Sequence, residues 1–149
     1  MIRIVVIAIS VFTFSCSASA EVSKSDAARY MDALRRVDGS ARQLIESGSV
    51  GVDDQINIGA EWTTPLVAAV IFGDRLTVDK LLTSGAKLDR TDKYNRTPIL
   101  KAVDQNDVQL LRVLLNGSRA SPAINIQESE FGNTPLHMAL TWNSVEMVR

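Results

Sequence analysis

The chain has 149 residues, of which 46% are hydrophobic and 22% charged, and its formal net charge is −1. This is the composition of an ordinary globular protein, and the length suggests about one domain. A charge so close to zero provides no basic surface of the kind that nucleic-acid-binding proteins carry, so we expect no nucleic-acid partner.

The first segment, residues 1–20, is predicted to be a cleaved secretory signal peptide. Arg3 gives a positive start, an apolar run of about eleven residues follows, and the ASA at 18–20 has the small-x-small pattern of a signal-peptidase site. The run is too short to span a bilayer, which takes about 20 residues. We therefore expect cleavage between Ala20 and Glu21 and a mature protein that is periplasmic or secreted.

Two alternatives for this segment remain open. It could stay uncleaved as an N-terminal anchor, or Cys16 could be lipidated, which would make the protein a lipid-anchored envelope protein. Cys16 is the only cysteine and follows a small residue, but Thr13 and Phe14 are unusual for a lipoprotein signal. A membrane contact is expected only if Cys16 is lipidated.

Cleavage at Ala20 would leave a mature chain without cysteine. Without Arg3, 15 of the 16 basic residues remain against 17 acidic ones, a net charge of −2. An exported protein without disulfides depends on its core alone, which fits a bacterial periplasm better than a eukaryotic extracellular space.

Residues 21–58 are predicted to form an N-terminal capping helix pair. A first helix is expected over 25–37 and a second over 40–46, separated by Asp38-Gly39. The apolar side chains on the inner face of the first helix are expected to be Tyr30, Met31, Leu34 and Val37. The pair lacks the Thr-Pro motif found downstream, as is typical of the atypical terminal units of stacked arrays.

A Thr-Pro pair recurs at 64–65, 97–98 and 134–135, in steps of 33 and 37 residues. Each pair predicts a helix start, because the threonine hydroxyl accepts a backbone N–H of the first turn and proline suits the first helical position. The residues expected to end these helices in a left-handed turn are Gly73, Asn106 and Asn143. A second, leucine-rich helix follows, and in the first unit we expect Leu82 to be buried.

These units resemble the ankyrin repeat. The matching positions are Thr64 to Leu66, Gly73, Leu81-Leu82, Gly85-Ala86, Asp92, Asn95, Thr97-Pro98, Gly132, Thr134 to His137 and Ala139. The resemblance implies an all-α solenoid of stacked helix pairs with hairpin-like loops over residues 59–149, with about two full repeats and one truncated. The connections at 49–61 and 116–128 are long, and the second is expected to hold the four-residue insertion.

Some positions depart from this pattern. Trp62 stands where the family has glycine, so an irregular hairpin is expected there. The third repeat stops before its Leu-Leu pair, from which we expect either a truncated chain or one that closes on a partner.

No catalytic residues, metal site or cofactor are expected. The only histidine, His137, has neither a cysteine nor a second histidine as a partner, and its place in the repeat implies a framework role beside the Thr-Pro turn. Phosphate-loop, G-x-S-x-G, H-E-x-x-H and C-x-x-C motifs are absent, and the acidic pair Asp53-Asp54 is expected to be solvated in a loop. A small exported hydrolytic enzyme is the alternative to a non-catalytic binding module.

The resemblance implies a protein partner, and no small-molecule substrate, at the hairpin tips and the ends of the first helices. The candidate partner-binding residues are Glu61, Ile71, Phe72, Lys93, Tyr94, Arg96, Asp104, Gln105, Glu130, Phe131, Asn133 and Trp142. Four of them are aromatic and are predicted to face solvent as interface anchors. Alternatively, these aromatics fold back onto the loops, or Trp142 packs against a missing repeat. The partner's identity is open, and so is the choice between an inhibitor or immunity role and a protective scaffold.

Overall fold

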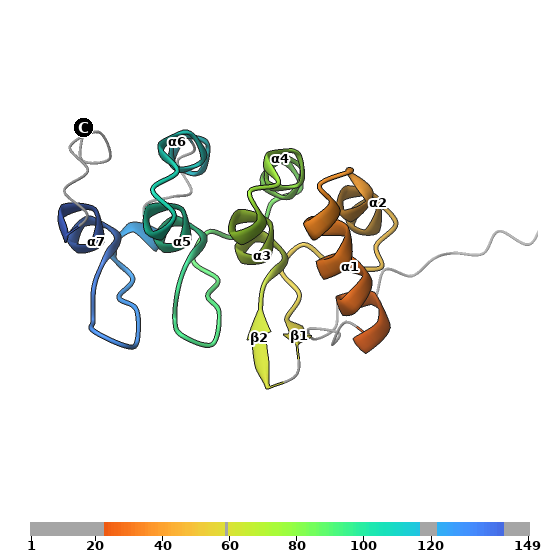
Figure 1. The fold of residues 1–149 in the computed structure, drawn as a ribbon, viewed down its shortest axis with the longest axis horizontal. Coiled ribbons are helices and arrows are strands. Elements are labelled where there is room, and N and C mark those ends of the chain that lie inside the picture. The colour runs from red at the N-terminus through yellow and green to blue at the C-terminus, as the bar shows by residue number, and fades with distance from the viewer. Residues whose placement is uncertain (1–22, 59, 117–121, 142–149) are drawn as a thin grey trace, which may run out of the picture.

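The computed structural model describes residues 23–58, 60–116 and 122–141, and their α-helices form a row of adjacent pairs (Figure 1). The helices are α1 (Lys24–Arg36), α2 (Ser40–Glu46), α3 (Pro65–Phe72), α4 (Arg75–Thr83), α5 (Pro98–Asp104), α6 (Val108–Leu115) and α7 (Pro135–Thr141). The remaining elements are β1 (Ile56–Ile58), β2 (Glu61–Thr63) and the 3-10 helix η2 (Ala123–Asn125). The predicted signal peptide, with Cys16 and the Ala20–Glu21 cleavage point, lies outside the described residues.

The predicted all-α solenoid is confirmed. Figure 1 shows α3, α5 and α7 side by side in one row, α4 and α6 in a second row, and the connecting loops projecting away from both. None of the helices in the described ranges is long and apolar enough to cross a membrane.

Each Thr-Pro pair starts a first helix, as predicted. The Thr64 hydroxyl accepts the Val67 N–H at 3.3 Å, and the Thr97 hydroxyl accepts the Leu100 N–H at 3.1 Å. Thr134 bonds the His137 N–H in the same way, at 3.4 Å. Each bond satisfies a backbone donor that the first turn would otherwise leave free.

The predicted helix ends are confirmed at two of three positions. Gly73 and Asn106 both have left-handed backbones, with φ of 67° and 54°. This conformation turns the chain back toward the second helix of the pair. The third predicted end, Asn143, lies outside the described residues.

The first helices are the centre of the core. In α3 every residue from Pro65 to Val70 is buried, because α3 lies between the capping pair on one side and α5 on the other. In the second helix of this unit the prediction of a buried Leu82 was wrong: Leu81 is fully buried, and Leu82 is only partly buried against the core. Neighbouring helical positions point about 100° apart, so only one of the two leucines faces directly inward.

The capping pair forms nearly where the sequence predicted it. Tyr30 and Leu34 are fully buried, and the Tyr30 hydroxyl donates a hydrogen bond of 3.1 Å to the Pro65 carbonyl, which joins the cap to the first repeat. Val37, predicted to face inward, is exposed instead. Its left-handed backbone, φ 50°, ends α1 and takes the side chain off the helix face.

The hairpin before the first repeat is regular, contrary to the irregular one predicted from Trp62. Strands β1 and β2 pair antiparallel, with Trp62 opposite Asn57. In the next two units the same position is occupied by Asn95 and Gly132, whose φ values are 57° and 69°. A left-handed residue bends the chain out of a strand, whereas tryptophan favours the extended backbone, so only the first unit forms a β-ladder among the described residues.

Candidate protein-binding surface

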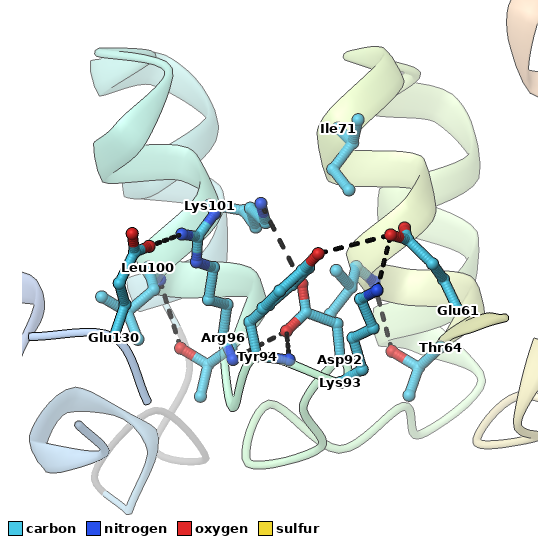
Figure 2. Close-up of polar contacts among 12 residues, drawn as sticks. Glu61, Thr64, Ile71, Asp92, Lys93, Tyr94, Arg96, Leu100, Lys101 and Glu130 are labelled. Atoms are coloured by element: carbon cyan, nitrogen blue, oxygen red, sulfur yellow. Dashed lines mark hydrogen bonds and ion pairs between the residues drawn. The ribbon is translucent and has the colours of Figure 1, made fainter. Parts of the chain in front are cut away.

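The loop tips ahead of each Thr-Pro and the ends of the first helices carry the predicted partner-binding residues. We call the described residues of this set, Phe72 excepted, the front surface, and they are Glu61, Ile71, Lys93, Tyr94, Arg96, Asp104, Gln105, Glu130, Phe131 and Asn133. Figure 2 shows its central part, in which side chains from three successive units meet around Tyr94.

Asp92 shapes the central tip. Its Oδ1 atom accepts the backbone N–H groups of Tyr94 and Arg96, both at 2.9 Å, and its own N–H donates to the Arg96 carbonyl. The carboxylate is buried inside the turn, where the Lys101 ammonium lies 4.0 Å from Oδ2. These bonds close the turn, so the side chains of Tyr94 and Arg96 project from it in fixed directions (Figure 2).

Glu128 has the same role in the next tip, and sequence reasoning missed it. Its carboxylate accepts the N–H groups of Glu130 and Phe131 at 2.7 Å and of Asn133 at 3.2 Å. Burial alone would raise the pKa of this carboxyl, but the three N–H donors lower it below its ordinary value of 4.5.

The tip around Glu128 is also one residue longer than the tip around Asp92. Six positions separate Glu128 from Thr134, but five separate Asp92 from Thr97. One of the four inserted residues therefore lies in the tip, beyond the 116–128 connection to which all four were assigned. The longer side chain of glutamate matches the wider turn. In the sequence, the signal for this role was that Glu128 is an acidic residue ahead of Gly132, as Asp92 is ahead of Asn95.

Ion pairs connect the three tips. The Lys93 ammonium lies 2.6 Å from Glu61 Oε1, and the same oxygen accepts the Tyr94 hydroxyl at 3.3 Å. On the other side the Arg96 guanidinium lies 3.2 Å from Glu130 Oε2. The hydrogen bond from Lys93 lowers the pKa of Glu61, and Glu61 in turn raises the pKa of Lys93.

The Tyr94 ring lies among these charges. The Lys93 ammonium is 4.6 Å from the ring centroid and the Arg96 guanidinium carbon is 5.3 Å away, both within cation–π range. The tip is also bound to its neighbours through the main chain, since the Lys93 N–H donates to the Trp62 carbonyl and the Ser129 N–H donates to the Tyr94 carbonyl. Tyr94 is thus held in place although 42% of it is exposed.

At the helix ends, Gln105 and Ile71 are linked across the first two repeats. The Gln105 amide donates to the Ile71 carbonyl at 2.7 Å, and the Ile71 side chain remains exposed, as does Asp104. This contact places both helix ends beside one another above the tips. The front surface therefore consists of mainly charged side chains at the loop tips and of mixed polar and apolar side chains at the ends of α3 and α5.

The four predicted aromatic anchors have different surroundings. Phe131 is 76% exposed and Tyr94 faces solvent in part, as predicted. Phe72 is not open to solvent as predicted: as the last residue of α3 it packs in part against the core, so we exclude it from the front surface. Trp142 lies outside the described residues.

The groups considered for catalysis have structural roles. His137 Nδ1 lies 2.9 Å from the Thr134 hydroxyl and accepts the Thr134 N–H at 3.3 Å, which is a framework contact beside the turn. Asp53 and Asp54, expected to be solvated, are half-buried and accept the Lys87 and Gly51 N–H groups. Among the described residues, no three His, Cys, Asp or Glu side chains are grouped so that they could hold a metal.

Comparison with known proteins gives consistent matches. A family profile described as "Ankyrin repeats (3 copies)" matches residues 66–149. The chain is 34% identical over 111 residues to the nuclear factor NF-kappa-B p105 subunit of Rattus norvegicus, covering 72% of this chain and 11% of that protein. It is 31% identical over 88 residues to the p105 subunit of Gallus gallus, covering 59% of this chain and 9% of that protein.

A third similar protein is viral. The putative ankyrin repeat protein FPV031 of Fowlpox virus (strain NVSL) is 32% identical over 109 residues, covering 70% of this chain and 30% of the viral protein. The chain thus spans only a small part of the length of each relative. The similarity therefore supports a shared ankyrin repeat and nothing about the rest of those proteins.

Proposed function

Because the chain belongs to the ankyrin-repeat family, whose repeats are protein–protein interaction modules, we propose that it binds one protein partner through the front surface and catalyses no reaction. The observation that carries the proposal is Tyr94, an exposed aromatic residue whose side chain contacts Glu61 of the preceding unit and Lys93 and Arg96 of its own tip, and whose carbonyl accepts the Ser129 N–H of the next unit. A side chain held in place before binding loses little conformational entropy when a partner covers it.

The place of action is part of the same proposal. The apolar run and the ASA at 18–20 favour export through a cleaved signal peptide, and the mature chain would act in the periplasm. There it would inhibit a partner, as an immunity protein does, or protect a resident enzyme as a scaffold. The two roles differ in one measurable respect, since stoichiometric addition would lower the partner's activity in the first case and preserve it in the second.

Capture of the partner is the test of this proposal. The mature chain, residues 21–149, would be immobilised and exposed to a periplasmic extract of its native cell, and the retained protein identified and purified. Aromatic anchors at interfaces often contribute about 2 kcal/mol or more, which is roughly thirtyfold in affinity. We expect Tyr94→Ala to weaken binding of the purified partner by about that factor, with unchanged helical content.

Leu76→Ala is the matched control for this variant. Leu76 is a large apolar side chain on α4, outside the front surface, and it is 62% exposed. We expect the partner to bind this variant with the affinity of the wild type. Wild-type affinity in Tyr94→Ala, or an equal loss in both variants, would exclude the front surface as the binding site.

A further inference from the structure

We propose that the partner segment covering Tyr94 is cationic, with Lys or Arg side chains that bind Glu61 and Glu130. This inference rests on the proposed function and specifies the chemistry of the partner at the same surface. It is drawn from the way the charges of the front surface are exposed and paired.

The positive and negative ends of the two inter-repeat ion pairs differ in exposure. The side chains of Glu61 and Glu130 are 58% and 56% exposed, whereas those of Lys93 and Arg96 are 26% and 27% exposed. Both cations lie near the Tyr94 ring, and the carboxylate is the more exposed member of each pair (Figure 2). A partner approaching this surface therefore meets carboxylate oxygens before it meets nitrogen.

Among the contacts of the described residues, one oxygen of each carboxylate is left for a further donor. Both contacts of Glu61 in the described part of the chain use Oε1, and the contact of Glu130 to Arg96 uses Oε2. A carboxylate can accept donors on both oxygens, so the second oxygen can take an ammonium or guanidinium without loss of the existing pair.

An anionic partner would fit this surface poorly. To reach Lys93 or Arg96 it would have to displace Glu61 or Glu130 and pass the remaining carboxylates. The third exposed charge of the front surface, Asp104, is also acidic, and Lys101 is turned toward buried Asp92. Like charges at an interface oppose association, so the exposed acids select for a basic segment.

The probe for this inference is a pair of octapeptides, (Arg-Ala)4 and (Glu-Ala)4. In an extended peptide alternate side chains point the same way, and eight residues span about 26 Å, so four guanidinium groups can face Tyr94 and both carboxylates. Binding to the mature protein would be followed by backbone amide NMR shifts at 50 mM and 200 mM salt.

We expect (Arg-Ala)4 to bind with its largest shifts at Tyr94, Ile71 and Glu130, more weakly at the higher salt, and (Glu-Ala)4 not to bind. The double variant Glu61→Gln, Glu130→Gln should weaken (Arg-Ala)4 about tenfold. The control, Asp32→Asn with Asp79→Asn, has the same net charge but alters exposed acids on α1 and α4, and it should bind like the wild type.

Three results would overturn the inference: no binding of (Arg-Ala)4, binding of (Glu-Ala)4 of equal strength, or an equal loss in both double variants. These results are separable from a failure of the proposed function. If the captured natural partner still depends on Tyr94 while (Arg-Ala)4 does not bind, the front surface stands and its cationic preference is wrong. If the partner binds Tyr94→Ala with the affinity of the wild type, the proposed function itself fails.

Discussion

At the scale of single residues, two carboxylates determine the shape of the loop tips. Asp92 and Glu128 each accept backbone N–H groups from the residues that follow them, two for Asp92 and three for Glu128. An ionised carboxylate accepts hydrogen bonds and donates none, whereas protonation of Glu128 would turn one of its oxygens into an O–H donor facing the N–H groups, so the tip that presents Phe131 depends on charge inside a turn. Stability measurements at acidic pH therefore test the role of this carboxylate.

Glu128→Gln should therefore destabilise the protein in a pH-dependent way. The pKa of Glu128 is lowered in the folded protein, so its ionised form adds stability above its ordinary pKa of 4.5, and this stability is lost as the pH falls through the folded value. We expect the free energy of unfolding in urea at pH 7 to fall by about 1.5–3 kcal/mol, the range for hydrogen bonds to a charged group. The difference in unfolding free energy between the variant and the wild type should become smaller below pH 4.5.

The control for this variant is Asp79→Asn, which changes an exposed acid on α4 and should alter stability little at either pH. If Glu128→Gln lowers the free energy of unfolding by the same amount at pH 7 and at pH 3.5, the ionised carboxylate does not stabilise the tip.

Residue-scale patterns were predictable only in part. The Thr-Pro starts and the left-handed Gly73 and Asn106 could be predicted, because each depends on local backbone chemistry. The role of Glu128 was missed, since its tip is one residue longer and the repeat spacing hides the equivalence with Asp92. The inter-repeat pairs were missed as well, although opposite charges about one repeat apart, such as Glu61 and Lys93, were a usable signal.

At the scale of elements, each helix is stable because its neighbours cover it. Apart from α1, the described α-helices have between seven and nine residues. Helices of that length are only marginally stable in isolation. Packing therefore decides which positions matter, and in α4 it separates two adjacent leucines. The sequence alone could not make that distinction, because either leucine fits the repeat.

Leu81→Ala should cost about 2–5 kcal/mol of unfolding free energy, because it empties a fully buried site. Leu82→Ala should cost less than Leu81→Ala, since that side chain already meets solvent in part. Urea melts of the two variants side by side give the comparison. Equal costs, or a larger cost for Leu82, would mean that α4 is rotated from the orientation described here.

At the scale of the whole molecule, the units are tied together at three levels. Tyr30 bonds the cap to Pro65, Arg75 pairs with Asp107 between α4 and α6 at 3.2 Å, and Arg96 pairs with Glu130 between two tips. The solenoid itself was predictable from the period. The regular first hairpin was not, because a tryptophan in a glycine position shows that the usual turn fails without showing what replaces it.

The most direct test of the front surface is amide hydrogen exchange of the mature protein, alone and saturated with its captured partner. The account predicts that binding slows exchange in the tips, residues 92–96 and 128–133, and at the end of α5, while exposed amides of α4 and the 49–55 loop are unchanged. Amide exchange reports local opening, so coverage of a tip is registered where it occurs. Slowing confined to α4, α6 or the 49–55 loop would contradict the account, because the partner would then bind elsewhere.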